Sequence, residues 1–315
     1  MKKINLGASG LMSPVMSLGC MRMMRMGIGD AAAAKVLEAA MEAGLNFFDH
    51  ADVYGPDGRA ERVFAEAVKQ VGIKREDMIV QTKCGIVRNT QNTANAAFNF
   101  SKEHIIASAE GSLRRLSTDY IDVYMLHRPD TLMEPEEVAE AFDNLHSRGL
   151  VRYFGVSNQS SGQMRLLQKY TGHKLVANQL QFSIVHTSMV DFGFNVNMKN
   201  DASIDHDGGL LEYCRLEDVT IQAWSPFRLK DMSGVFIDHP DYPELNEVLA
   251  ALSEKYNVTK DAIAATWILR HPANMQVIVG SMNPERVTAV AKAADVVLTR
   301  NEWHEIYFAA GNRLP

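Results

Sequence analysis

The stretch AAAAKVLEAAMEAGLNFFDHADVY, residues 31–54, decides the fold class. Its first half is apolar at positions three to four apart, which predicts a helix with one apolar face formed by Val36, Leu37, Ala40 and Met41. Gly44 marks the expected end of that helix, and the run 45–48 follows directly as a buried strand. A helix that leads straight into a buried strand is typical of a parallel α/β fold.

The same alternation continues along the chain. Runs of buried-strand character recur at 15–18, 45–48, 78–82, 121–126, 153–156, 175–178, 220–223 and 276–279. Helical spacing recurs between them, with Ser101 as an expected N-cap and Pro135 in an expected first turn. Eight such units predict a (β/α)8 TIM barrel with a C-terminal helix, in which residues 1–315 form a single domain. The polar segments 183–209 and 228–243 are expected to be long functional βα loops.

Composition excludes several functional classes. With 46% hydrophobic and 22% charged residues over 315 positions, the chain has the composition of a globular protein. The formal net charge is -6 and basic residues do not cluster, so we expect no nucleic-acid partner. The three cysteines form no C-x-x-C pair, and neither a signal peptide nor a long apolar span is visible. We therefore expect a cytoplasmic monomer without a membrane segment or a bound metal.

Four side chains that follow predicted strands form a chemical set. Asp49 and Tyr54 follow the run 45–48, Lys83 follows the run 78–82, and His127 follows the run 121–126. The carboxyl ends of barrel strands share one mouth, where barrel enzymes hold their active sites. A phenol with a pKa of about 10 is a poor proton donor at neutral pH, and a nearby ammonium lowers that pKa. Asp49 would orient Lys83, Lys83 would activate Tyr54, and His127 would position a carbonyl oxygen, so the set predicts a carbonyl-protonating site.

Several motifs carry a resemblance to a known family. The sequences NFFDHADVYG at 46–55, LHRP at 126–129, GVSN at 155–158 and GSMNPER at 280–286 resemble, in this order, motifs of the aldo-keto reductase family. The similarity covers essentially the whole chain and is strongest to bacterial oxidoreductases of the YdhF type. The resemblance implies a barrel that binds NADPH and reduces small aldehydes or ketones to alcohols. It gives Tyr54 the role of general acid, tuned by Lys83 and Asp49, and gives His127 the role of orienting the carbonyl.

The resemblance also implies a set of cofactor contacts. The nicotinamide carboxamide would be held by Ser157, Asn158 and Gln179, and the nicotinamide ring would stack on Trp224. The pyrophosphate would be approached by Ser225, Phe227 and Arg228. The adenosine phosphate would be bound by Gly280, Ser281, Asn283 and Arg286. Because a guanidinium suits a 2′-phosphate, NADPH is expected in preference to NADH.

Two other functions remain open at this stage. One is a nicotinamide-sensing regulatory protein that binds the cofactor with little turnover. The other is a metal-dependent hydrolase built on Asp49, His50, Asp52 and His127, although the chain holds no H-x-H or H-E-x-x-H motif. It also stays open whether the methionines between Met21 and Met26 line a substrate pocket or pack the loop, and whether the thiol of Cys84 is reactive or structural.

Overall fold

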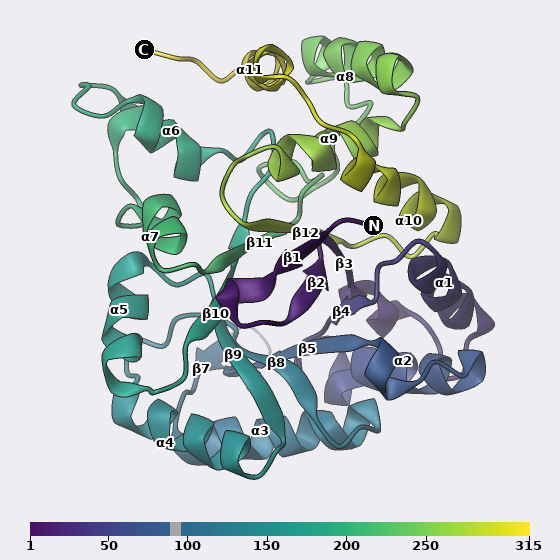
Figure 1. Ribbon diagram of the computed structural model, residues 1–315, viewed down its shortest axis with the longest axis vertical. Helices are drawn as coiled ribbons and strands as arrows, with labels where there is room; N and C mark the ends of the chain where they lie inside the picture. Colours follow the sequence, from purple (N-terminus) through teal and green to yellow (C-terminus); the bar gives the residue numbers. More distant parts are fainter. Residues whose placement is uncertain (89–95) are drawn as a thin grey trace.

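The structure, a computed structural model, describes residues 1–88 and 96–315 and is built on a closed barrel of parallel strands (Figure 1). In chain order the barrel strands are β3 (Met16–Gly19), β4 (Phe47–Asp49), β5 (Ile79–Cys84), β8 (Ile121–Leu126), β9 (Val151–Ser157), β10 (Leu175–Gln181), β11 (Thr220–Trp224) and β12 (Met275–Val279). Each strand pairs with the next along the chain, and β12 pairs with β3 to close the ring. The predicted (β/α)8 fold and its eight strands are therefore confirmed, with small differences at the strand ends.

Helices surround the barrel (Figure 1). They are α1 (Ala31–Glu42), α2 (Arg59–Val71), α3 (Lys102–Leu116), α4 (Pro135–Ser147), α5 (Ser161–Tyr170), α6 (Ser188–Phe194), α7 (Leu210–Leu216), α8 (Pro243–Tyr256), α9 (Lys260–Leu269), α10 (Pro284–Ala291) and the expected C-terminal helix α11 (Arg300–Ala309). The predicted helix signals hold, because the Ser101 hydroxyl accepts from the His104 amide and Pro135 opens α4. The apolar stripe of α1 is buried at Val36, Leu37 and Ala40, which fixes that helix against the core.

An antiparallel hairpin, which the sequence analysis did not predict, covers the amino-terminal end of the barrel. Its strands are β1 (Lys3–Asn5) and β2 (Met12–Pro14), joined by a turn in which Leu6 is fully buried against Phe47 and Val123. Gly7 in this turn has φ +57°, and a Cβ there would lie 2.3 Å from the Val176 carbonyl oxygen, so only glycine permits the close approach. A second hairpin, β6 (Ile86–Arg88) with β7 (Ala96–Phe98), follows β5.

One loop prediction needs correction. The segment 183–209 contains the short helix α6, because Met189 and Val190 are buried in the core and draw a helical turn onto it. The segment 228–243 is a loop as expected, and it is stabilised by an antiparallel bridge between Arg228 and Val235. Within the described residues, no helix combines the length and apolarity that crossing a membrane requires.

Candidate active site

Most of the predicted site residues line one cavity of about 370 Å³ at the carboxyl ends of the barrel strands. They are Asp49, Tyr54, His127, Ser157, Asn158, Gln179, Trp224, Ser225, Phe227, Arg228, Gly280, Ser281 and Arg286. Lys83 lies directly behind this cavity, bonded to Asp49 and Tyr54, and Asn283 lines an adjoining hollow. The structure therefore brings together side chains that are up to 237 positions apart between Asp49 and Arg286.

A buried ion pair between Lys83 and Asp49 lies at one end of the cavity. The Lys83 ammonium lies 2.7 Å from Asp49 Oδ1 and 2.8 Å from Oδ2, and the two side chains are 0% and 4% exposed. Burial alone would lower the pKa of Lys83, but the attraction of Asp49 outweighs it and the pKa is raised. Lys83 is therefore a protonated cation, and it is fully buried.

The three N–H groups of Lys83 all have partners. Besides Asp49, the ammonium donates to the His50 carbonyl oxygen at 2.7 Å and to the Tyr54 phenol oxygen at 3.3 Å. Because the phenol oxygen accepts from Lys83, its own hydrogen points away from the ammonium and is free to be donated into the cavity. The turn that presents Tyr54 depends on Gly55, which has φ +88° and whose Cβ would lie 2.8 Å from Met24 Cβ.

The electrostatics of Tyr54 differ in part from the sequence-based expectation. Burial raises the pKa of Tyr54, and although Lys83 pulls the pKa down as expected, the net direction is upward. The phenol is therefore fully protonated at neutral pH in the free protein. Lys83 reduces the energy needed to form the phenolate without producing it in the resting state.

His127 lies beside the phenol as a neutral ring. Its centroid is 5.9 Å from that of Tyr54, with the rings nearly perpendicular. Burial, helped by the charges of Lys83 and Arg128, lowers the pKa of His127 to about 2. His127 follows β8 directly, and its backbone amide donates to the Cys84 carbonyl oxygen at 2.9 Å, which fixes the ring at the mouth.

Two glutamine side chains bind Asp49 in addition to Lys83. The Gln81 side-chain amide donates to Asp49 Oδ1 at 2.6 Å, and the Gln179 amide donates to the same oxygen at 3.0 Å. A carboxylate oxygen that accepts from one ammonium and two amides is held firmly in one position. The sequence analysis placed Gln179 on the cofactor, whereas in this structure its nitrogen binds Asp49.

A chain of glutamines runs from Asp49 through the barrel interior. Gln276 donates to the Pro14 carbonyl oxygen at 2.7 Å, so its own oxygen faces Gln222 and accepts from it at 2.9 Å. The Gln222 oxygen then accepts from Gln81 at 2.8 Å, and the second N–H of Gln81 is the one that reaches Asp49. Since a carbonyl oxygen only accepts, Pro14 fixes the orientation of all three amides so that a donor faces the carboxylate.

The residues predicted to hold the nicotinamide are hydrogen-bonded to one another. The Ser157 hydroxyl donates to the Gln179 carbonyl oxygen at 3.0 Å, and the Asn158 side chain donates to Ser157 at 2.7 Å and accepts from the Trp224 indole at 3.1 Å. Asn158 and Ser225 have positive φ values of 55° and 54°, so the chain turns sharply as it leaves β9 and β11. These contacts hold Trp224 fixed in the cavity wall.

Four arginines converge at the opposite end of the cavity. Arg22, Arg25, Arg228 and Arg286 all line it, and Arg22 donates to the Gly280 carbonyl oxygen at 2.7 Å. Burial and the charges of the other three arginines lower the pKa of Arg22. Like charges gathered in this way repel one another and favour a bound polyanion.

The hollow beside these arginines also contains acidic groups. It measures about 450 Å³, shares Val235 and Arg286 with the main cavity, and includes Asn283. Arg286 forms an ion pair with Asp261, while the Asn283 side chain accepts from the Arg286 amide at 2.9 Å and caps α10. Arg286 is therefore oriented by Asp261 rather than free in solvent.

Comparison with known proteins identifies the family. A model described as "Aldo/keto reductase family" matches residues 15–308. The chain belongs to the aldo/keto reductase family. It is 34% identical to the oxidoreductase YdhF of Escherichia coli, over 93% of this chain and 92% of the relative. It is 31% identical to a 6-dehydroglucose reductase of Novosphingobium aromaticivorans, over 98% and 96% of the two chains.

A solved structure shows the same fold. An aldo-keto reductase from Klebsiella pneumoniae, in complex with NADPH, superposes with a TM-score of 0.78, covering 99% of this chain and 96% of that one at 24% identity. The family and the fold both agree with the resemblance drawn from the sequence motifs, and this chain is an oxidoreductase.

The structure of this aldo/keto reductase bears on the alternatives that the sequence left open for the methionine segment, for Cys84 and for a metal site. Met21 lines the cavity whereas Met23 is fully buried in the core, so the methionine segment serves both purposes. Cys84 is fully buried, and burial raises its pKa, which makes it an unreactive thiol. Across residues 1–88 and 96–315, no group of three or more histidine, cysteine or carboxylate side chains is arranged to hold a metal.

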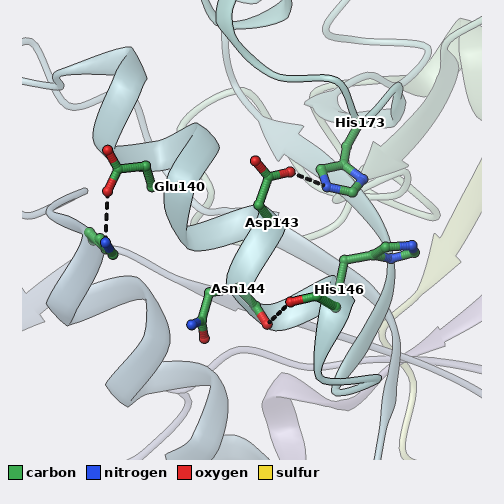
Figure 2. A pocket seen from close by; sticks show the side chains of 7 residues that line it. Glu140, Asp143, Asn144, His146 and His173 are labelled. Carbon is green, nitrogen blue, oxygen red and sulfur yellow. Dashed lines mark hydrogen bonds and ion pairs between the residues drawn. The ribbon is translucent and has the colours of Figure 1, made fainter.

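A further hollow lies on the outside of the barrel, away from the main cavity. Figure 2 shows it over α4, lined by Asp143 and His146, with His173 from the segment before β10. Its polar groups are satisfied by one another, since His173 pairs with Asp143 at 2.9 Å and His146 bonds the Val151 carbonyl oxygen. This surface resembles an ordinary gap between helices rather than a catalytic site.

Proposed function

We propose that residues 1–315 act as a single catalytic domain that reduces aldehyde or ketone carbonyls to alcohols with NADPH, using Tyr54 as the general acid. The observation that carries the proposal is the hydrogen-bond pattern of Lys83. Its N–H groups are committed to Asp49, the His50 carbonyl and the phenol oxygen, which leaves the phenol hydrogen for a substrate in the cavity.

The chain's own residues supply each proton-handling task. Tyr54 donates its hydrogen to the carbonyl oxygen, and Lys83 stabilises the phenolate that results because it already bonds that oxygen. Asp49 keeps Lys83 charged, and the glutamine chain directs a hydrogen-bond donor at Asp49. His127 stays neutral and donates an N–H to the same carbonyl oxygen, which aligns it with the phenol.

The residues present fit a nicotinamide dinucleotide. When bound, NADPH supplies the hydride for the carbonyl carbon. Trp224 would stack on its ring beside Ser157, Asn158 and Gln179. Ser225, Phe227 and Arg228 would bind the pyrophosphate, and Gly280, Ser281, Asn283 and Arg286 would bind the adenosine phosphate. The four converging arginines support this fit, since they form a cationic end suited to a polyanion. The preference for NADPH over NADH rests on Arg286.

The test is NADPH consumption, followed by absorbance, against a panel of aldehydes, quinones and dicarbonyls, with cofactor binding titrated in parallel. We expect turnover with at least part of the panel and tighter binding of NADPH than of NADH. Binding of NADPH with no turnover of any carbonyl would contradict the proposal and would favour the nicotinamide-sensing alternative.

A further inference from the structure

A second buried ion pair lies behind the catalytic groups, between the barrel wall and the helices α2 and α3, which pack side by side (Figure 1). Arg115 of α3 donates through Nε to Glu61 Oε2 of α2 at 2.6 Å, and the Glu61 side chain is fully buried. The other Glu61 oxygen accepts from the Thr82 hydroxyl of β5 at 2.7 Å. The ion pair therefore joins two helices to the strand that carries Lys83.

The path of the Arg115 side chain depends on two glycines. A Cβ at Gly58 would lie 2.2 Å from Arg115 Nε, and a Cβ at Gly111 would lie 2.9 Å from Arg115 Nη1. Arg115 also donates to the Ser112 hydroxyl at 3.0 Å, so its guanidinium is held in one position beside Glu61. Because the guanidinium carries a single positive charge, it balances a single carboxylate.

Asp52 adds a second carboxyl group to this ion pair. Its Oδ1 is buried without a hydrogen-bond partner among the described residues, and an unpaired buried oxygen costs far more free energy when it is charged. Burial and the negative charge of Glu61 raise the pKa of Asp52 to about 7, although the charge of Arg115 pulls that pKa down. With both carboxyls ionised the three groups carry an uncompensated negative charge, whereas with a proton on Asp52 they are neutral together.

The other groups that interact electrostatically with Asp52 do not remove this imbalance. The full set is Glu61 on α2, Arg115 on α3, Lys83 and Cys84 on β5, and Tyr124 on β8. Lys83 attracts Asp52, but its charge is already balanced by the ion pair in the cavity. Burial raises the pKa of Cys84 and of Tyr124, so both are neutral. Ionisation of Asp52 therefore leaves an unbalanced negative charge beside Glu61.

The backbone connects this carboxyl pair to the contact between Tyr54 and Lys83. Asp52 lies two residues before Tyr54, and its amide donates to the Lys83 carbonyl oxygen at 3.0 Å. The Tyr54 carbonyl oxygen accepts from the amide of Ala60, the residue before Glu61, at 3.0 Å. At 3.3 Å the hydrogen bond from the Lys83 ammonium to the phenol oxygen is already long, so a small displacement of the turn weakens it.

We propose that Asp52 is a positioning residue for Tyr54, which holds a proton in the active enzyme and whose ionisation slows carbonyl reduction. When the proton leaves for solvent, repulsion between Asp52 and Glu61 displaces the turn at residues 50–55 and moves the phenol oxygen away from Lys83. The rate then falls as the pH rises through neutrality, below the range in which Tyr54 itself loses its proton, because the pKa of Tyr54 is raised. This inference rests on the proposed reductase function and adds a residue that acts from outside the cavity.

The test follows the single-turnover rate of NADPH oxidation by a carbonyl that the wild type reduces, from about pH 6 to about pH 8.5. The wild type should slow by about fivefold to tenfold over this range, as should the matched control Asp57→Asn, which changes an exposed carboxylate just after the same turn. Asp52→Asn, which stays neutral, should slow by less than about twofold. Glu61→Gln should behave like Asp52→Asn, because Arg115 then balances the ionised Asp52. An equal fall in the wild type and Asp52→Asn, or no fall in the wild type, would overturn the proposal.

Infrared difference spectra between the wild type and Asp52→Asn report the proton on Asp52 without any turnover. We expect the C=O stretch of a protonated carboxyl group at about pH 6 and its loss by about pH 8.5, and in Glu61→Gln the loss should occur at lower pH. If the wild type reduces carbonyls but this band is absent at about pH 6, the Asp52 proposal is wrong and the reductase proposal stands. If the wild type reduces no carbonyl, the reductase proposal fails, and the positioning role of Asp52 fails with it whatever the spectra show.

Discussion

Replacing Lys83 with methionine should remove a large part of the stability margin of the fold. Methionine keeps the length of the side chain but leaves the Asp49 carboxylate, 4% exposed, without the ammonium that now lies 2.7 Å away. Among the described side chains, the amides of Gln81 and Gln179 remain to stabilise that charge. Breaking a buried ion pair on one side costs about 3–5 kcal/mol. Since a domain is stable by about 5–15 kcal/mol, this is a large fraction of the total.

The assay is urea unfolding of the wild type, Lys83→Met and the double variant Lys83→Met/Asp49→Asn, at pH 7 and pH 5. The double variant should recover more than half of the loss, because it contains no unpaired buried charge. In Lys83→Met, Asp49 has no cationic partner, so its pKa in the folded state should lie above its pKa in the unfolded state. The free energy of unfolding of this variant should therefore rise as the pH falls. A loss below about 1 kcal/mol at pH 7, or a double variant no better than the single one, would refute the reasoning.

Three further predictions follow from other parts of the site. Gln222→Met interrupts the glutamine chain, so kcat for carbonyl reduction should fall by about fivefold to tenfold with the Kd for NADPH unchanged; an unaltered kcat would show that the chain does not position Asp49. Burial raises the pKa of Asp52 to about 7, above its unfolded value, so the wild type loses stability as the pH rises from about 5 to 8, and Asp52→Asn should abolish that loss in thermal unfolding. Arg286→Ala should weaken NADPH by about tenfold or more and NADH by less than about threefold in fluorescence titrations, and equal weakening would remove Arg286 from 2′-phosphate recognition.

The barrel was predictable because its strands are buried on both faces. Such strands appear in a sequence as short apolar runs, and the polar residue after each run, such as His127 after β8, marks the catalytic mouth. The β1–β2 hairpin was missed since its three-residue strands carry no apolar run, and α6 was missed because its seven residues, SMVDFGF, are too few to show a helical period.

The contacts among the polar residues that surround the site could not be predicted from the sequence, for a different reason. Gln81, Gln222 and Gln276 are polar residues inside apolar strands, which marks them as unusual, but their mutual contacts depend on the register around the closed barrel. The pairing of Arg286 with Asp261 likewise joins α10 to α9 and has no local signal. Three-dimensional closure, rather than residue type, creates these interactions.

The most direct test of the central claim is a single-turnover measurement on Tyr54→Phe. Protein loaded with NADPH is mixed rapidly with a carbonyl that the wild type reduces, and the loss of nicotinamide absorbance is followed. Phenylalanine preserves the ring that packs beside His127 and removes only the proton donor. The account predicts that the rate of hydride transfer falls by about 10²–10⁴-fold while the Kd for NADPH stays within about twofold. A variant that transfers hydride at close to the wild-type rate would contradict the assignment of Tyr54 as the general acid.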